Sequence, residues 1–339
     1  MRVALLGFGS VGQGVAKMLG EKDLGLTLTA LADSRGGIID PDGISIPGAF
    51  SRKEKSGSCG RPRPRVSALD IVNSDAYDVL VEVTPTNIET GEPALTHIRK
   101  ALGLRRHVVT SNKGPIALAY RELTGLAGEK GVALRYEATV AGAIPIIHTL
   151  QHGLLGNTVA ALFGVMNGTC NYILTRMEDE GLSYDQALGE AQEMGYAEKD
   201  PTYDVKGLDT ALKLVILANT VWGTGAGLAD VQVTGIDLIT PEAIQLAMDQ
   251  ETAIRLIGEA IPTKDLLRVS PRIIPRNHPL LVEGTLNALT VVADMAGELT
   301  FIGKGAGSIE TASAVIGDLL YIRERYAGIP EGRPDARRP

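Results

Sequence analysis

The chain has 339 residues, with 33 Lys or Arg and 40 Asp or Glu, and a formal net charge of −7. This length favours two domains over one, and the acidic balance gives no support for binding to nucleic acid or to a membrane. Two cysteines, Cys59 and Cys170, are too few for a disulfide framework and suit a reducing cytoplasm. No apolar run is long enough for a membrane helix, and the strand-like start leaves no room for a signal peptide. We therefore expect a cytoplasmic α/β enzyme.

A glycine-rich turn follows the first predicted strand. Residues 2–6 have the pattern of a buried strand, and residues 11–19 continue with helical spacing. A G-x-G-x-x-G turn between strand and helix bends the chain tightly, lets a pyrophosphate approach the backbone and lets the helix pack closely. The residues expected to contact a dinucleotide here are Gly7, Phe8, Gly9, Ser10, Val11 and Gly12.

The second predicted strand, residues 26–32, leads to an acidic residue. Asp33 follows the last glycine of the turn by about 20 residues, which is the spacing of dinucleotide-binding βαβ units. An acid at this place holds the adenosine ribose hydroxyls and favours NAD. Arg35 would instead meet the 2′-phosphate of NADP, so both cofactors stay open. The alternative is a plain βαβ unit with a glycine turn.

Polar residues follow two further predicted strands of the first domain, residues 77–83 and 106–110. Open α/β sheets bind ligands at the carboxyl ends of their strands. Lys113 would also fit a surface lysine at a helix start, although its place at a strand end favours a role in the site. The residues expected at this edge are Thr84, Pro85, Ser111 and Lys113.

Two other stretches have clear patterns. Residues 51–65 are basic and rich in Gly, Pro and Ser, which predicts an exposed, mobile loop. A phosphate-binding or nucleic-acid role is the weaker alternative for this loop. Residues 241–260 have the pattern of one long helix.

After residue 150 several strands and few long helices suggest a mixed sheet backed by helices, which would pair across a dimer. A second glycine turn at residues 303–307 precedes a helix and indicates that the chain returns to the first domain. The predicted fold is α/β, with an N-terminal Rossmann-type nucleotide-binding domain and an α+β substrate and dimerisation domain. The predicted domains are residues 1–136 for the dinucleotide, 137–302 for the substrate and dimerisation, and 303–326 for the returning helix.

The central stretch, residues 190–219, combines charges with an apolar helix. A loop with Glu198 and Asp204 precedes a predicted helix that carries Asp209 and Lys213. Those two residues are four apart, so they share one face of the helix. Because the neighbours of Lys213 are apolar, its ammonium must reach a carboxylate or a cavity. The group is either a surface pair beside a solvated loop or a site where carboxylates hold a substrate amine and the lysine moves a proton.

Residues 190–219 resemble the signature of the homoserine dehydrogenase family, and the resemblance extends over essentially the whole chain. Flanking segments 82–87, 110–115, 137–147 and 303–307 resemble that family too, except that Lys304 stands where a proline is more usual. The matching residues of the central stretch are Ala191, Gly195, Tyr196, Ala197, Asp200, Pro201, Asp204, Val205, Gly207, Asp209 and Lys213, and the segment NGTCNYIL at 167–174 also matches.

The resemblance implies an NAD(P)-dependent interconversion of L-homoserine and L-aspartate 4-semialdehyde, in threonine and methionine biosynthesis. It implies that Lys213 exchanges a proton with the C4 oxygen, with Asp209 beside it and Lys113 as the second lysine. Because the chain ends soon after the last predicted helix, we expect no regulatory ACT-type extension or fused kinase. Whether the expected homodimer forms a tetramer stays open. The implied substrate residues are Glu198, Asp204, Tyr196, Thr169 and Gly168; Gly305 belongs to the cofactor site; and Glu137 with the carbonyls of Val140, Gly142 and Ile144 forms a sodium site.

Two other functions remain as alternatives. A non-catalytic NAD(H) sensor would use the Rossmann half alone, but no DNA-binding or partner-docking module stands out. Aspartate-semialdehyde dehydrogenase needs a thiolate nucleophile, and Cys170 has no histidine close to it in sequence.

Overall fold

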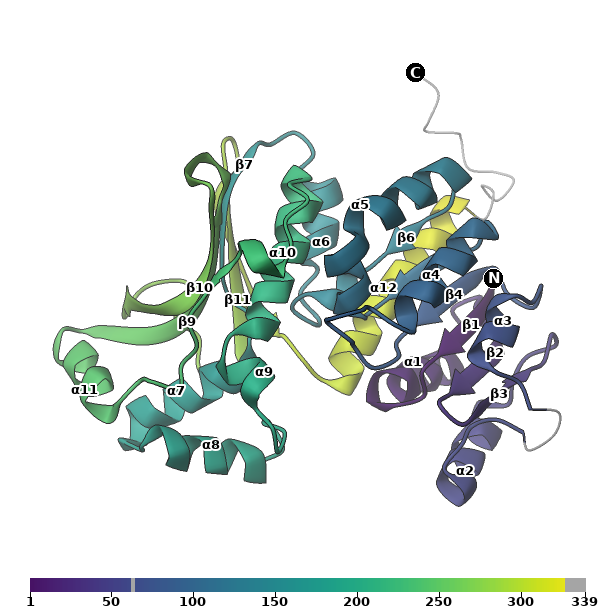
Figure 1. The fold of residues 1–339 in the computed structure, drawn as a ribbon, viewed down its shortest axis with the longest axis horizontal. Coiled ribbons are helices and arrows are strands. Elements are labelled where there is room, and N and C mark those ends of the chain that lie inside the picture. The colour runs from purple at the N-terminus through teal and green to yellow at the C-terminus, as the bar shows by residue number, and fades with distance from the viewer. Residues whose placement is uncertain (62–64, 327–339) are drawn as a thin grey trace. The chain divides into compact units, whose positions relative to one another are not determined.

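The computed structural model describes residues 1–61 and 65–326. The chain divides into two compact units. The first unit contains residues 1–139 and the described residues from Ser308 on, and the second contains residues 140–307. Figure 1 labels the helices and strands of both units.

The first unit contains a six-stranded sheet in the order β3-β2-β1-β4-β5-β6. All neighbouring strands are parallel except β3, which is antiparallel to β2. The strand order reverses at β1, which lies between β2 and β4, and open α/β sheets bind ligands at such a point. The strands are β1 (Arg2–Leu6), β2 (Thr27–Asp33), β3 (Gly36–Ile39), β4 (Val79–Glu82), β5 (His107–Thr110) and β6 (Leu134–Arg135).

Helices connect these strands and cover the sheet (Figure 1). Helix α12 follows the second unit in sequence and packs against α1 of the first unit. The helices are α1 (Ser10–Glu21), α2 (Ile46–Ser56), α3 (Ala68–Val72), α4 (Ala94–Gly103), α5 (Lys113–Lys130), the 3-10 turn η1 (Glu137–Thr139) and α12 (Ser308–Tyr326).

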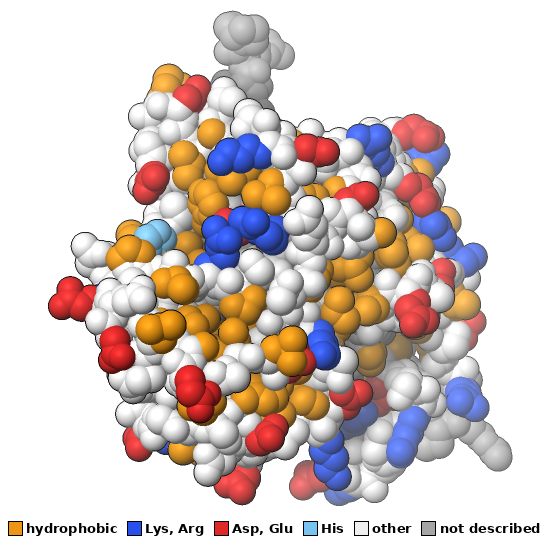
Figure 2. Space-filling model, turned by 60° about the vertical axis from the view of Figure 1, so that its left-hand side comes forward, with side chains coloured by type: hydrophobic (Ala, Val, Ile, Leu, Met, Phe, Trp, Pro, Cys, Tyr) orange, Lys and Arg blue, Asp and Glu red, His pale blue; other side chains and the backbone are white. Residues whose placement is uncertain are grey.

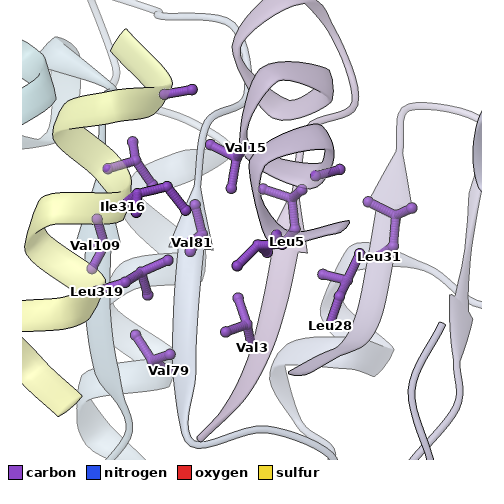
Figure 3. Packing of buried hydrophobic residues seen from close by; sticks show 14 of the residues in the cluster. Val3, Leu5, Val15, Leu28, Leu31, Val79, Val81, Val109, Ile316 and Leu319 are labelled. Atoms are coloured by element: carbon purple, nitrogen blue, oxygen red, sulfur yellow. The ribbon is translucent and has the colours of Figure 1, made fainter. Parts of the chain in front are cut away.

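The core of this unit lies between the sheet and the helices α1 and α12. The central strands are apolar along their length, because a parallel sheet is covered on both faces. Figure 3 shows Val3 and Leu5 of β1 beside Val81 of β4, with Ile316 and Leu319 of α12 packed over them. These side chains are 5% exposed or less, so α12 supplies an essential wall of the core.

The second unit contains a mixed six-stranded sheet in the order β12-β11-β7-β9-β10-β8. Its neighbours are antiparallel except β10 and β8, which are parallel. The predicted α/β class with a second, mixed sheet is therefore confirmed. The strands are β7 (Val159–Val165), β8 (Gln232–Val233), β9 (Thr252–Ile261), β10 (Leu266–Pro275), β11 (Leu286–Ala293) and β12 (Gly297–Lys304).

Helices α7 and α10 pack against this sheet. Every residue of α10 from Asp209 to Asn219 is buried, which explains its almost continuous apolar sequence. The helices of the unit are α6 (Ile146–His148), the π-helix η2 (Thr149–Gly153), α7 (Gly168–Glu180), α8 (Tyr184–Glu193), α9 (Thr202–Val205), α10 (Leu208–Trp222), η3 (Leu228–Asp230), α11 (Pro241–Asp249) and η4 (Pro262–Lys264).

The helix predicted over residues 241–260 is wrong in its second half. Helix α11 ends at Asp249, the chain turns at Glu251 with a φ of 56°, and β9 begins at Thr252. Strand β9 lies between β7 and β10 and is buried over most of its length. A strand that is buried on both faces shows no alternation of polar and apolar residues, so a helix and a central strand look alike in sequence.

The mobile loop predicted over residues 51–65 is wrong for residues 51–56, which form the second half of a helix. Residues 46–56 form α2, whose first turn is capped by Ser45 Oγ accepting from the Gly48 N–H. Gly57 ends the helix with a φ of 72°, and Cys59 beyond it is fully buried. Residues 62–64 lie outside the described part of the chain. The capping serine and the closing glycine are helix signals that the basic composition concealed.

None of the helices in the described residues is long and apolar enough to cross a membrane.

Candidate active site

The glycine turn joins β1 to the N-terminus of α1. Gly7 has a φ of 101°, and a side chain there would meet the Val83 carbonyl oxygen at 2.5 Å. A Cβ atom on Gly12 would lie 2.0 Å from the Gly7 carbonyl oxygen. Both glycines are therefore required for the turn itself. Gly9 differs, because in the described part of the chain no atom beyond its own neighbours in sequence lies within 4 Å of its Cβ position.

Gly9 is the N-cap of α1, and no side chain caps the first turn of that helix. The first N–H groups of a helix without such a cap are available to an anion, and the helix dipole favours negative charge there. With open space beside Gly9, the turn fits the pyrophosphate of a dinucleotide, as the sequence predicts.

Asn112 connects the two loops that follow β4 and β5. Its Nδ2 donates to the carbonyl oxygens of Thr84 and Pro85, at 3.0 and 3.3 Å, and its Oδ1 accepts from the Gly114 N–H. Thr84 and Pro85 follow β4, while Ser111 follows β5 and Lys113 begins α5. Because β1, β4 and β5 are neighbours, the loops that carry these predicted cofactor residues lie at one edge of the sheet. The sequence analysis did not single out Asn112.

A buried carboxylate supports the same edge. Glu82 is fully buried at the end of β4, and its Oε1 accepts from the N–H and the hydroxyl of Thr84. His97 of α4 is also buried, with its Nδ1 3.7 Å from that oxygen. The two hydrogen bonds to Glu82 hold Thr84 at the end of β4.

Asp33 is surrounded by donors. Its Oδ1 accepts from the N–H groups of Arg35 and Gly36 and from Ser58 Oγ, and its Oδ2 accepts from Lys53 Nζ at 2.9 Å and from the Cys59 N–H at 2.8 Å. Burial alone would raise the pKa of this carboxyl, but the hydrogen bonds from Lys53 and the backbone lower it to about 2. The side chain is only 4% exposed. Asp33 thus organises the β2–β3 turn and the end of α2 into one basic cluster.

Lys213 of α10 is buried in the second unit and anchored on two sides. Its Nζ donates to Asp209 Oδ2 at 2.7 Å and to the Met166 carbonyl oxygen at 2.6 Å. Asp209 is 5% exposed and Lys213 is 7% exposed, which removes the interpretation as a solvated surface pair. Met166 lies directly after β7, so the strand end and the helix together fix the ammonium group.

Asp204, at the end of α9, lies next to this pair. Asn167, the N-cap of α7, donates through Nδ2 to Asp204 Oδ1 at 2.7 Å and to Asp209 Oδ2 at 3.0 Å. Burial and then the negative charge of Asp209 raise the pKa of Asp204. Burial also raises the pKa of the Tyr203 hydroxyl, and Asp209 and Asp204 raise it further.

The other predicted substrate residues surround the start of α7. Thr169 Oγ1 donates to the Tyr196 carbonyl oxygen at 2.8 Å, which holds the loop after α8 against α7. The Tyr196 ring packs on Tyr172, with ring centroids 4.9 Å apart. Gly168 lies close to the Thr285 carbonyl oxygen, where a Cβ atom would approach to 2.9 Å. Glu198 is exposed farther along the same loop.

The residues of the implied sodium site follow one another along the chain at the boundary between the units. Glu137 is 5% exposed and belongs to the first unit, where its N–H donates to Asp318. Val140, Gly142 and Ile144 belong to the second unit, as does Gly305. Within the described residues no group of three or more His, Cys, Asp or Glu side chains is arranged to hold a metal. The implied sodium site is of another kind, because three of its four ligands are main-chain carbonyl oxygens.

The structure brings most of the predicted residues together within their own units. Gly7 to Gly12 adjoin the Thr84 loop in the first unit, and Asp204, Asp209 and Lys213 form one network in the second. Sequence reasoning missed Asn112, Asn167 and Tyr203. The two asparagines stand in segments that were singled out, and their places before predicted helices were the available signal.

A Rossmann-type unit with an open glycine turn, together with a unit that carries a buried lysine–carboxylate pair, defines a dinucleotide-dependent dehydrogenase. The family model described as homoserine dehydrogenase matches residues 145–320. A model described as glutamate/leucine/phenylalanine/valine dehydrogenase matches residues 1–82, the part that carries the glycine turn. The chain belongs to the homoserine dehydrogenase family.

Individual relatives support this assignment. A homoserine dehydrogenase from Methanocaldococcus jannaschii is 46% identical over 333 residues, covering 95% of this chain and 98% of the relative. An NAD(+)-dependent homoserine dehydrogenase from Pseudomonas canavaninivorans is 35% identical, covering 95% of this chain and 96% of the relative. The solved structure of a hyperthermophilic archaeal homoserine dehydrogenase in complex with NADPH superposes with a TM-score of 0.83 at 30% identity, covering 98% of this chain and 99% of the other. The protein is thus an NAD(P)-dependent oxidoreductase.

Proposed function

We propose that the protein interconverts L-homoserine and L-aspartate 4-semialdehyde, with Lys213 as the acid and base at the C4 oxygen. The anchoring of Lys213 is the observation that supports this role most directly. An ammonium group carries three hydrogens, and within the described residues Lys213 Nζ donates to two partners, Asp209 and the Met166 carbonyl. One hydrogen is therefore left for a substrate oxygen.

The chemistry follows from the charge on Lys213. When bound, the nicotinamide ring supplies a hydride for reduction and accepts one in oxidation. In reduction, negative charge develops on the C4 oxygen, and the Lys213 ammonium stabilises and protonates it. In oxidation, neutral Lys213 removes the proton from the C4 hydroxyl. Asp209 keeps the amine in place at 2.7 Å, and Lys113, the first residue of α5, is proposed as the second lysine near the reacting oxygen.

The amino-acid part of the substrate is proposed to bind at Glu198, Asp204, Tyr196, Thr169 and Gly168. A carboxylate that is buried beside another carboxylate is stabilised when a cation approaches it. Asp204 is in this situation, since burial and Asp209 both raise its pKa. The ammonium group of homoserine would relieve that cost, which supports Asp204 as its partner.

The cofactor is proposed to lie along the turn from Gly7 to Gly12 and the edge formed by Thr84, Pro85, Ser111 and Lys113, with Gly305 from the second unit. The open space at Gly9 and the uncapped start of α1 support the pyrophosphate position.

The surroundings of Asp33 favour NADP over NAD. A carboxylate has about four lone-pair sites, and Asp33 already accepts from five donors. Ribose hydroxyls would have to displace one of them. Arg35 and Lys53 stand beside this saturated acid, and a 2′-phosphate is the group that two cations bind well. We therefore propose that Asp33 orders this cluster and that Arg35 contacts the phosphate.

Sodium is proposed as a further ligand. The Glu137 carboxylate and the carbonyl oxygens of Val140, Gly142 and Ile144 are hard oxygen ligands of the type that such cations prefer. Their closeness in sequence is what supports this proposal.

We also propose that the protein is a cytoplasmic homodimer or tetramer. We propose that it binds neither nucleic acid nor membranes. The proposed domain boundaries are those predicted from the sequence, at 136/137 and 302/303. Exposed apolar residues on two strands of the second sheet support association, since Ile273 of β10 is 64% exposed and Ile302 of β12 is 55% exposed. Figure 2 shows hydrophobic side chains around a group of Lys and Arg side chains on one face.

The thiols argue against aspartate-semialdehyde dehydrogenase. Cys170 is fully buried, its Sγ lies 3.2 Å from the Asp204 carbonyl oxygen, and burial raises its pKa well above the ordinary value. Burial and Asp33 raise the pKa of Cys59 to about 12. A thiol that stays protonated at neutral pH is a poor nucleophile.

The test is a spectrophotometric assay of purified protein with L-homoserine, in the presence of sodium and at alkaline pH, with NAD and NADP in separate reactions. Homoserine-dependent reduction of either cofactor is expected, and the larger kcat/KM is expected with NADP. Absence of reduction with both cofactors would reject the homoserine reaction. The sensor and the semialdehyde dehydrogenase would then be compared by adding aspartate semialdehyde and phosphate.

A further inference from the structure

Asn167 occupies the space between two carboxylates of the second unit. It follows β7 directly and caps α7. Its Nδ2 donates to Asp204 Oδ1 at 2.7 Å and to Asp209 Oδ2 at 3.0 Å, while its Oδ1 accepts from the Cys170 N–H at 2.8 Å. Both hydrogens of the amide are used, so the amide orientation is fixed by its surroundings.

The Asn167 amide donates hydrogen bonds to both carboxylates without adding a positive charge. Asp209 Oδ2 is shared between Asn167 Nδ2 and Lys213 Nζ. A second cation here would compete with Lys213 for Asp209 and with a substrate amine for Asp204. A neutral donor satisfies one oxygen of each carboxylate and leaves the charges to their partners. Asn167 is 6% exposed, so water does not replace it.

The hydrogen bond from Asn167 also keeps Asp204 ionised. Burial and Asp209 raise the pKa of Asp204, and the bonds from Asn167 and Thr169 and the charge of Lys213 oppose that rise. Helices α7 and α10 pack against α9. Their ionisable residues near Asp204 are Cys170, Asp209 and Lys213, and Tyr203 is on α9 itself. The other charged side chains of this region pair elsewhere, Lys206 with Asp237, Arg176 with Glu190, and Glu178 with Arg255.

We propose that Asn167 is a positioning residue that couples the substrate-binding carboxylate of Asp204 to the proton-transferring pair of Asp209 and Lys213. The proposal rests on the function proposed above, because it takes Asp204 as the partner of the substrate amine. It adds Asn167 to that site. The role of Asn167 is to fix the positions of the Asp204 and Asp209 carboxylates relative to Lys213.

Two substitutions separate this role from helix capping. Asn167→Ser keeps a good N-cap and removes the amide. Asn167→Asp keeps the shape and the cap acceptor but replaces the donor with a carboxylate oxygen. The measurement is the pH profile of kcat/KM for reduction of L-aspartate 4-semialdehyde, with kcat and KM determined separately at each pH. In this direction Lys213 acts in its protonated form, so the acid limb reports the ionisation of Asp204 and not of the lysine.

Loss of the amide removes a bond that favours the ionised form of Asp204, so the pKa of Asp204 rises further and the carboxylate forms at higher pH. The acid limb of the profile is therefore expected to move up by about one pH unit in Asn167→Ser. It should move farther in Asn167→Asp, which adds a like charge. The KM for L-aspartate 4-semialdehyde should rise, and kcat/KM at the wild-type optimum should fall by about 10- to 100-fold.

Asn171→Ser is the matched control. Asn171 lies one turn farther along α7, and its Nδ2 donates only to the carbonyl oxygens of Val282, Gly284 and Leu286. This variant should lower the melting temperature and leave the acid limb and the KM unchanged.

If both Asn167 variants lose activity with an unmoved acid limb and an unchanged KM, Asn167 is a helix cap only and the proposal is overturned. If the wild-type protein does not oxidise homoserine, the proposed function fails, and this proposal fails with it.

Discussion

Lys213 lies in a helix whose other side chains around it are almost all apolar, and the polar groups that it contacts come from its own helix and from the end of β7. Lys213→Ala removes the proton donor and acceptor but leaves the first unit unchanged. We expect kcat to fall by about 10²- to 10⁴-fold, with binding of NADPH, followed by its fluorescence, unchanged. Lys206→Ala, which removes an exposed pair with Asp237, is the control and should retain activity. Equal turnover by Lys213→Ala and wild type would assign the proton transfer to another residue.

Arg35 carries the expected preference for NADP. Within the described residues its side chain makes one hydrogen bond, a long one of 3.4 Å to the Ser56 carbonyl oxygen, so it can turn toward a phosphate. Arg35→Ala is expected to raise the KM for NADP by about 10- to 100-fold, the value of a charge-assisted hydrogen bond, and to change the KM for NAD little. Parallel initial-rate measurements with the two cofactors provide the check. A similar loss with both cofactors would place the adenosine ribose elsewhere.

At the scale of single residues, the sequence predicted the roles of charged residues with a fixed spacing, but not those of uncharged residues. Asp209 and Lys213 stand out because an ionic pair in an apolar helix needs an explanation. Asn167 has no charge and is found at helix starts for ordinary reasons, so its second role depends on the approach of α9 and α10, which sequence spacing does not reveal. Asp33 illustrates the opposite case. Its position was predictable, but three of its five donors, Lys53, Ser58 and Cys59, come from a segment that was expected to be a mobile loop.

The glycine turn makes different demands on its glycines at the scale of the element. Gly12→Ala would place a Cβ atom 2.0 Å from the Gly7 carbonyl oxygen, whereas Gly9 has a φ of −87° and no protein atom near its Cβ position. We expect Gly12→Ala to lower the melting temperature of the protein without cofactor. Gly9→Ala should leave that temperature unchanged and raise the KM for the dinucleotide about tenfold or more, through loss of close approach by the pyrophosphate. An unaltered KM in a folded Gly9→Ala protein would contradict the assigned pyrophosphate position.

Helix α12 has a buried and an exposed face that can be tested separately. Leu319 is fully buried in the core of the first unit, and Leu319→Ala is expected to lower the free energy of unfolding by about 2 to 5 kcal/mol. Gly317 is exposed in the same helix with no atom within 4 Å of its Cβ position, so Gly317→Ala should add about 0.5 to 1 kcal/mol. Urea denaturation measures both. If the two substitutions changed the free energy of unfolding equally, or in the reverse directions, α12 would not pack as the structure shows.

Elements with a clear period or a clear end signal were predictable, including the parallel strands of the first sheet and the helix after the second glycine turn. The errors lie where the sequence is ambiguous. Residues 252–261 are buried on both faces because β9 is central in its sheet, so no alternation marks them as a strand. Helix α2 has a basic composition, although Ser45 and Gly57 mark its ends. The short strand β3 was missed, because only its pairing with β2 defines it.

Association is the prediction at the scale of the whole molecule. The protein should elute with a mass of at least twice the 35.8 kDa of one chain in size-exclusion chromatography with light scattering. Ile273→Glu introduces a charge on the exposed part of β10 and should shift the population toward monomers. Leu69→Glu, at a residue of α3 with 41% exposure in the first unit, is the control and should leave the mass unchanged. A wild-type monomer at micromolar concentration would reject the homodimer.

The placement of α12 has a consequence for how the protein is made. The core of the first unit needs Ile316 and Leu319, yet a ribosome completes residues 140–307 before it reaches them. At about 5 to 20 residues per second this interval is on the order of ten to thirty seconds. During that time the apolar face of the first sheet that α12 covers stays exposed, and at its end the second unit has its whole sequence. The order of synthesis thus favours folding of the second unit before the first is complete, and it makes the unfinished first unit the natural client of a chaperone.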